Sequence, residues 1–165
     1  MLSENIVQIA ETIKQLHQRV DERRNVWSQT TKPQIKKCFE QVCKEIDLDL
    51  HVAENEIRTN FSSVQLSFGI APSGIIERTP RGGARSFTKY PGYLNFAQNI
   101  SGKIMVAVSY PFVEDFHNEP ATLLFAQHEP EDINEDLIMS HIVKFLEEIV
   151  KWEVNWRQPN KLIGE

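Results

Sequence analysis

Histidines with carboxylate neighbours are the residues of this sequence whose types could support metal binding or acid–base chemistry. None of these groups has a recognised ligand spacing such as HExxH. The groups are His51 with Glu54 and Glu56, His117 with Glu114, Asp115 and Glu119, and His128 with Glu129. A metal ion needs ligands that converge in space, which neighbours along a loop do not guarantee. We therefore predict no metal site and no cofactor, and interpret these groups as acidic loops that happen to contain histidine.

Nucleophilic catalysis has little support in the sequence. There is no GxSxG motif, and Cys38 and Cys43 fall on the apolar side of a predicted helix, where a thiol is usually inert. Five positions on a helix rotate the two cysteines about 140° from each other, so they cannot bridge. We predict no catalytic residue. An enzyme whose histidines and carboxylates are brought together only by the fold is kept as a third hypothesis.

The stretch ERTPRGGARSFTKYPG, from Glu77 to Gly92, concentrates positive charge in a chain whose net charge is -5. Aromatic residues alternate with its basic residues, and arginines beside aromatic faces can hold anions or single-stranded nucleic acid. The candidate ligand-binding residues are Arg78, Arg81, Arg85, Lys89 and Tyr90.

The same stretch lacks the features of a nucleotide site. It matches neither GxxxxGK[ST] nor GxGxxG, and a strand pattern rather than a helix follows Gly92. The acidic remainder of the chain would also repel a long polyanion, which argues against a nucleic-acid partner without excluding one. We therefore predict a mobile, solvated loop at about residues 77–92. Binding of an anionic ligand or a single strand through it is the alternative.

Two helices are predicted at the start of the chain. The first begins after Ser3, a suitable N-cap residue, and carries one apolar stripe with alternating spacings of three and four residues. The stripe consists of Ile6, Ile9, Ile13, Leu16 and Val20. We expect this stripe to pack against its own domain, with pairing to a second copy as the alternative.

The second helix is predicted to start at Thr31, as the N-cap, with Pro33 close to the position where its missing N–H has no consequence. Its expected buried side consists of Ile35, Cys38, Phe39, Val42, Cys43 and Ile46. The connection SQTTKP is short, so the two helices are predicted to form an antiparallel hairpin.

From Asp47 onward the apolar period changes to two, which predicts strands. Pro72 and Gly74 are expected to end the second of them. Ile104, Val106 and Val108 alternate with further apolar residues, which predicts a central strand. The predicted strands cover approximately residues 47–53, 63–70, 92–98, 103–110 and 121–127.

A long helix is predicted near the end of the sequence. Asp132, followed three residues later by Glu135, resembles a capping box, and a broad apolar stripe follows. Trp152 and Trp156, at the end of this stripe, are interpreted as core residues rather than as an anchor for a partner. A frayed tail is predicted at about residues 158–165.

The segment from Ala121 to Glu153, ATLLFAQHEPEDINEDLIMSHIVKFLEEIVKWE, resembles the ending of bacterial type III secretion chaperones, which are small acidic dimeric α+β proteins. The resemblance covers about a fifth of the chain, and the two consecutive leading helices depart from that pattern. It implies partner binding and a possible homodimer.

Composition limits the remaining classes. The chain has 165 residues, 41% of them hydrophobic and 25% charged, which fits one globular domain. No apolar run approaches the ~18 residues of a membrane helix, and the start lacks the pattern of a secretory signal. We predict a single cytoplasmic α+β domain spanning residues 1–165, with its helices on one face of an antiparallel sheet of four or five strands. Its predicted function is non-catalytic protein interaction, adaptor or chaperone-like.

Overall fold

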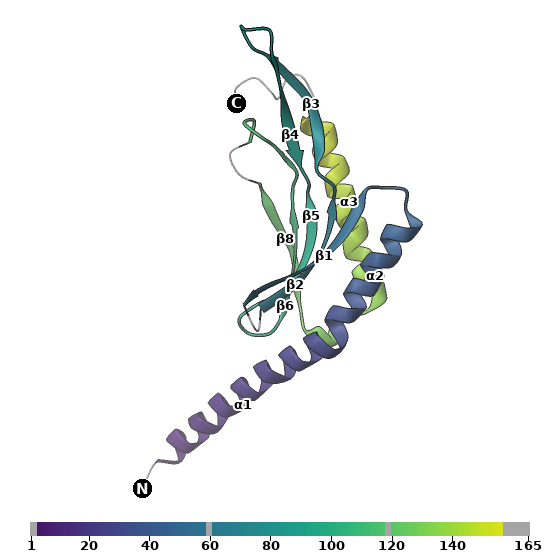
Figure 1. Cartoon of the computed structure of the whole chain (residues 1–165). Helices are drawn as coiled ribbons and strands as arrows, with labels where there is room; N and C mark the ends of the chain where they lie inside the picture. Colours follow the sequence, from purple (N-terminus) through teal and green to yellow (C-terminus); the bar gives the residue numbers. More distant parts are fainter. Residues whose placement is uncertain (1–2, 59–60, 118–119, 157–165) are drawn as a thin grey trace.

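The computed structural model describes residues 3–58, 61–117 and 120–156 (Figure 1). The tail predicted at 158–165 lies outside these residues. The helical elements are α1 (Glu4–Val26), a π-helical segment η1 (Trp27–Thr31), α2 (Lys32–Glu45), a short 3-10 helix η2 (Pro130–Asp132) and α3 (Glu135–Trp156). The strands are β1 (Leu50–Arg58), β2 (Phe61–Phe68), β3 (Ala71–Arg78), β4 (Ala84–Tyr90), β5 (Tyr93–Gln98), β6 (Ile104–Ser109), β7 (Phe112–Val113) and β8 (Thr122–His128).

The strands form two antiparallel sheets, which confirms the α+β class. The larger sheet has five strands in the order β1-β2-β5-β6-β8. Neighbours in this sheet are also consecutive in the chain, except that β3 and β4 intervene between β2 and β5, and β7 intervenes between β6 and β8. The smaller sheet has the order β3-β4-β7. As predicted, β6 is an interior strand, because it pairs with β5 on one side and β8 on the other.

The core lies between one face of the five-stranded sheet and the helices α2 and α3, as the sequence predicted. Alternate residues of β2, β5 and β6 point towards the helices, and α2 also contacts α3. The largest fully buried apolar side chains are Phe39, Phe96, Phe145, Ile35, Leu66, Leu94, Ile104, Ile138, Val64, Val106 and Val108.

The two helices predicted at the start of the chain are one continuous helix, so the predicted hairpin is wrong. Residues 4–45 are helical throughout, and the π-helical turn η1 replaces the expected loop. Pro33 has no N–H for the helical ladder, and a wider turn just before it accommodates this loss. Thr31 is therefore not an N-cap. It has α-helical dihedral angles, and its hydroxyl donates to the carbonyl of Pro130 at 2.9 Å.

Trp27 attaches this helix to the sheet. Its side chain is buried in the core, and its indole Nε1 donates to the hydroxyl of Ser62 on β2 at 2.8 Å. The N-terminal half of α1 extends away from both sheets (Figure 1). None of the residues of α1 is buried.

The basic stretch is a β-hairpin rather than the predicted loop. Residues of β3 pair with β4 in antiparallel register, with Glu77 opposite Arg85, and the turn between the strands covers only 79–83. The backbone N–H of Thr79 donates to the carbonyl of Gly83 at 2.8 Å, and the N–H of Gly83 donates to the Thr79 hydroxyl at 3.0 Å. Gly82 has the positive φ that favours glycine. Gly and Pro are concentrated in this turn and at residues 91–92, which leaves 84–90 free to form a strand.

Two boundary predictions also fail for local reasons. Pro72 does not end a strand but lies in β3, an edge strand with a register shift after Pro72, where the missing N–H breaks no necessary pairing. The capping residue of α3 is Asn134 rather than Asp132, since Asn134 Oδ1 accepts the backbone N–H of Leu137 at 2.9 Å. In the part of the chain that the structure describes, no helix has the length and apolar content needed to cross a membrane.

Candidate functional site

Three of the five predicted ligand-binding residues form ion pairs or ring contacts with other residues of the same chain. Arg85 donates to Asp115 at 2.8 Å, lies 3.6 Å from Glu114, and covers the ring of Phe87 at 4.8 Å. Lys89 forms an ion pair with Glu153 of α3 and lies over the ring of Trp152. The ring of Tyr90 stacks on that of Phe112 with centroids 4.8 Å apart.

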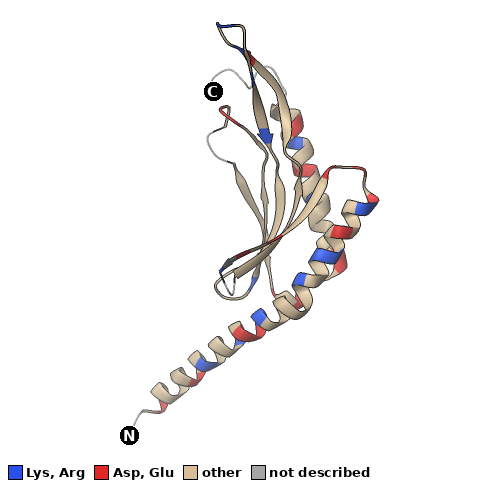
Figure 2. Cartoon of the chain, viewed as in Figure 1, with Lys and Arg blue, Asp and Glu red and all other residues tan. Residues whose placement is uncertain are grey.

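Arg78 and Arg81 remain as exposed cations at the end of the hairpin (Figure 2). Arg78 is the last residue of β3, and Arg81 lies in the turn. The hairpin thus presents two arginines to solvent, while Arg85 and Lys89 hold it to acidic residues of the body. The predicted cluster of five ligand-binding residues is not assembled as one site.

The histidines of the three groups each contact a residue outside their own group. His51 contacts Asp49 at 2.7 Å on an exposed surface, and His117 Nδ1 accepts the backbone N–H of Val113 at 2.9 Å. His128 contacts another histidine, His141 of α3, with 3.0 Å between their Nε2 atoms. Within the described ranges, no three His, Cys, Asp or Glu side chains are arranged to hold a metal ion.

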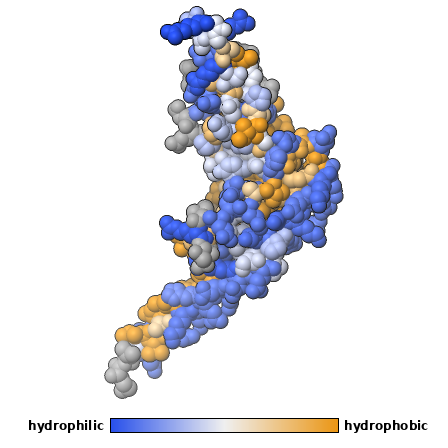
Figure 3. Space-filling model, viewed as in Figure 1, coloured by the Kyte–Doolittle hydropathy of each residue, from blue (hydrophilic) through white to orange (hydrophobic). Residues whose placement is uncertain are grey.

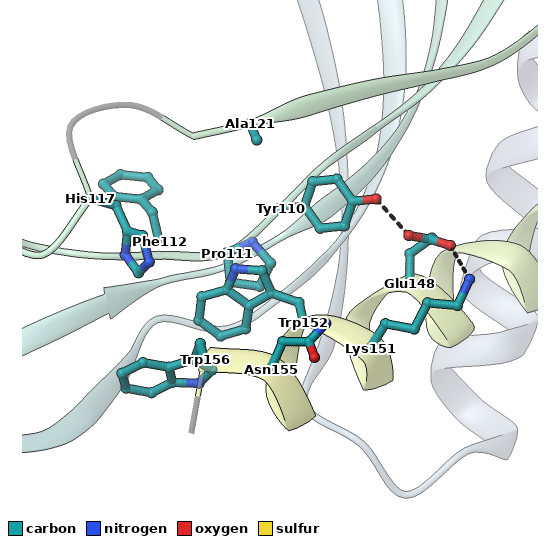
Figure 4. A pocket seen from close by; sticks show the side chains of 10 residues that line it. All are labelled: Tyr110, Pro111, Phe112, His117, Ala121, Glu148, Lys151, Trp152, Asn155 and Trp156. Atoms are coloured by element: carbon teal, nitrogen blue, oxygen red, sulfur yellow. Dashed lines mark hydrogen bonds and ion pairs between the residues drawn. The ribbon is translucent and has the colours of Figure 1, made fainter. Parts of the chain in front are cut away.

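An aromatic pocket of about 500 Å³ lies between the end of α3 and the chain that follows β6 (Figure 4). Trp152 and Trp156 stack with ring centroids 5.3 Å apart, and the ring of His117 lies 6.0 Å from Trp152. These tryptophans are half-buried and line the pocket, so they are only partly the core residues that the sequence predicted. The remaining lining includes Tyr110, Pro111, Phe112, Ala121, Glu148, Lys151 and Asn155.

Three polar groups of this pocket bind one another. Tyr110 donates its hydroxyl to Glu148 at 2.5 Å, and Lys151 donates to the other carboxylate oxygen at 2.6 Å. These two donors, Lys151 first, hold the pKa of Glu148 below its usual range. Both oxygens of the ionised Glu148 carboxylate thus accept hydrogen bonds from Tyr110 and Lys151. The pocket is lined mainly by apolar and aromatic side chains, as small-ligand and side-chain pockets usually are.

Tyr110 provides a spectroscopic test of this arrangement. Burial, together with the hydrogen bond to Glu148, raises the pKa of Tyr110 to about 12. In an ultraviolet titration of phenolate formation, we expect Tyr110→Phe to remove the component that ionises at the highest pH. Tyr93→Phe is the control and should leave that component in place. Persistence of the component in Tyr110→Phe would contradict the contact with Glu148.

The third candidate surface is the outer half of α1. Four apolar side chains on one face of this helix, Ile6, Ile9, Ile13 and Leu16, form what we name the apolar seam. Their exposed fractions lie between 48% and 62%. Figure 3 shows this hydrophobic surface at the far end of the helix, outside the body of the molecule. The sequence prediction that the stripe packs against its own domain is wrong for these four residues.

The inner half of α1 is firmly attached to the body. Arg23 donates two hydrogen bonds, of 2.6 and 2.8 Å, to the carboxylate of Glu129 and a third, of 3.1 Å, to the carbonyl of Ser101. Arg19 donates to Glu131 at 2.8 Å and to Glu129 at 3.1 Å. The arginines lower the pKa of both carboxyl groups, Arg23 acting chiefly on Glu129 and Arg19 on Glu131. These contacts fix the direction in which the apolar seam projects.

Sequence reasoning identified the seam residues but missed the pocket and the histidine pair. The spacing of the stripe was visible, whereas its exposure depends on where the body ends. The pocket combines residues from 110–117 and Ala121 with residues from 148–156, and no local pattern links those segments. The two tryptophans one helical turn apart were the only available signal.

Comparison with known proteins adds no assignment: no protein-family model, curated protein or solved structure matches the chain.

Proposed function

We propose that this chain is a small, non-catalytic protein-interaction domain, adaptor or chaperone-like, and that it binds its protein partner through the apolar seam of α1. One observation carries the proposal. The seam is exposed to solvent, while the continuation of the same helix face, at Trp27, is buried in the core.

Exposure of the seam has a physical cost that a partner would remove. Burial of an Ile or Leu side chain is worth roughly 1.5–3 kcal/mol, and large contiguous apolar surfaces on soluble proteins commonly mark interaction sites. A helix with many β-branched residues and no packing is also only marginally stable in water. Contact along the seam would stabilise α1 and cover its apolar residues together.

The test is a variant that places charge on the seam, Ile9→Asp with Ile13→Asp. We expect association to weaken at least tenfold, because the carboxylates would have to be buried without partners. Sedimentation velocity of the purified chain measures self-association. Affinity capture from extracts of the source cell measures association with other proteins.

A control makes the charge more negative elsewhere on the molecule. Arg78→Glu with Arg81→Glu alters the exposed end of the hairpin and should leave association unchanged. The proposed function is wrong if the seam variant retains both the self-association and the captured proteins of the wild type.

The alternative function, binding of an anionic ligand or single strand by the hairpin, has weaker support. Only Arg78 and Arg81 of the predicted set are unengaged among the described residues, and two arginines neutralise few phosphates. Salt-sensitive association that is lost in the hairpin control variant, rather than in the seam variant, would favour this alternative.

A cytoplasmic location is part of the proposal. Cys38 and Cys43 are free thiols, and burial raises the pKa of both. Inert reduced thiols suit a reducing compartment. The third hypothesis, an enzyme, finds no supporting cluster in the pocket, because Tyr110, Glu148 and Lys151 bind one another there.

A further inference from the structure

The apolar face of α1 is divided between two environments. Its heptad positions run from the seam residues to Val20, Arg23 and Trp27 at alternating spacings of three and four. Val20 is half-buried, Arg23 donates hydrogen bonds to Glu129, and Trp27 is buried. From residue 20 onward this face of α1 therefore packs against the rest of the molecule. From Ile6 to Leu16 the same face is exposed to solvent.

We propose that the seam of a second copy of this chain covers the bare half of α1 in antiparallel orientation. Ile6 then lies opposite the partner's Leu16, and Ile9 lies opposite the partner's Ile13. This inference rests on the proposed function and names its partner. In heptad terms each a position meets a d position of the other helix, as knobs-into-holes packing of antiparallel helices requires.

The body of the molecule determines the orientation. In a parallel pair, residues 20–26 of the partner would lie along residues 20–26 of α1, where the turn 99–103 already packs. The fit there is tight, since a Cβ added to Gly102 would lie 2.8 Å from Arg23 Cβ and 3.2 Å from the carbonyl oxygen of Val20. In the antiparallel pair, the partner's residues beyond Leu16 extend past Ile6, away from this body.

The charge pattern of α1 favours a second copy as the occupant. The positions that flank the seam carry no charged Asp, Glu, Lys or Arg side chain, and they are Asn5, Ala10, Thr12 and His17. Glu11 and Lys14 lie on the outer face, where they pair with each other. Two identical helices can therefore approach without placing like charges of these types beside the interface.

Self-pairing also uses the seam completely. One two-fold axis between Ile9 and Ile13 brings all four seam residues of each chain into the contact, and it places Ala10 and Thr12 close to their own copies. An interface that is complementary to itself closes at two chains. Because only four apolar residues per chain contribute, the dimer should be concentration-dependent.

Cysteine cross-linking tests both the partner and the orientation. In the antiparallel register, Ile6→Cys with Leu16→Cys brings each new thiol opposite one of the partner, and mild oxidation should give a disulfide-linked dimer. Each single variant should give at least tenfold less. Its thiol lies ten residues, roughly 15 Å, from its copy, and a disulfide tolerates a Cα separation of about 7 Å.

The controls separate the possible failures. Oxidation of the wild type measures any cross-linking through the native Cys43. Circular dichroism tests whether the variants fold, which is expected because the substitutions lie far from the core. Efficient cross-linking of both single variants would establish a parallel pair and overturn the proposal. If no variant cross-links while Ile9→Asp with Ile13→Asp still abolishes capture of other proteins, the partner is a different protein. The second copy is then excluded, and the proposed function survives.

Discussion

Lowering the pH from 6.5 to about 4 is expected to reduce the free energy of unfolding by on the order of 3 kcal/mol through one side chain, His141. This side chain is 2% exposed, lies edge-on to Phe96 and is stacked with Phe125. Its Nε2 contacts His128, and its Nδ1 has no partner among the described residues. The site therefore suits a neutral imidazole.

The direction of the effect follows from the cause of the pKa shift. The pKa of His141 is lowered from 6.5 to about 4, chiefly by burial, with smaller contributions from His128 and Lys144. In this pH window the unfolded chain binds a proton at position 141 that the folded chain does not bind. The contribution of His141 is thus present in full above pH 6.5, declines as the pH falls, and is lost below about pH 4. Burial also lowers the pKa of His128, so its effect has the same sign.

Urea unfolding at a series of pH values measures this loss. His141→Gln should make the stability curve shallower between pH 6.5 and 4, because glutamine does not take up a proton. The matched control is His17→Gln on the exposed surface of α1, which should keep the wild-type slope. An unchanged slope in His141→Gln would show that His141 does not cause the acid sensitivity.

The second large effect is expected at Phe39 in the core. Phe39→Ala should lower the free energy of unfolding by about 3–5 kcal/mol, since it removes a fully buried ring and leaves a cavity. The ring of Phe39 packs edge-on against that of Phe96, with centroids 5.7 Å apart, so the substitution removes a contact between α2 and the sheet.

Denaturant unfolding at neutral pH checks this value, with Phe116→Ala as the control of the same residue type. Phe116 is 45% exposed, so Phe116→Ala should lower the free energy of unfolding by about 1 kcal/mol or less. Equal losses for the two variants would mean that α2 does not pack on the sheet as described.

The period of apolar residues predicted most of the fold. Ile35, Phe39 and Val42 were assigned to the buried side of a helix, and all three are buried. Val64 and Leu66 were likewise assigned to the inner face of a strand. These assignments succeed because a residue's face in a helix or strand depends only on its position along the chain.

Breaks in the chain were harder to predict, because Pro and Gly have several uses. Pro33 was interpreted as the start of a new helix, and Pro72 as the end of a strand. The structure accommodates Pro33 with a π-helical turn and Pro72 in an edge strand. The glycines of the basic stretch serve one tight turn rather than a long loop.

The sequence by itself determined the α+β class, the buried faces of its elements and the apolar seam of α1, because each depends on local spacing. Only the tertiary structure decided what those elements meet. Trp27 and Thr31 hold the helix to β2 and Pro130, and this attachment leaves Ile6 to Leu16 beyond the body. The aromatic pocket and the histidine pair likewise join segments distant in sequence. Such contacts arise from the packing of whole elements, which no local pattern encodes.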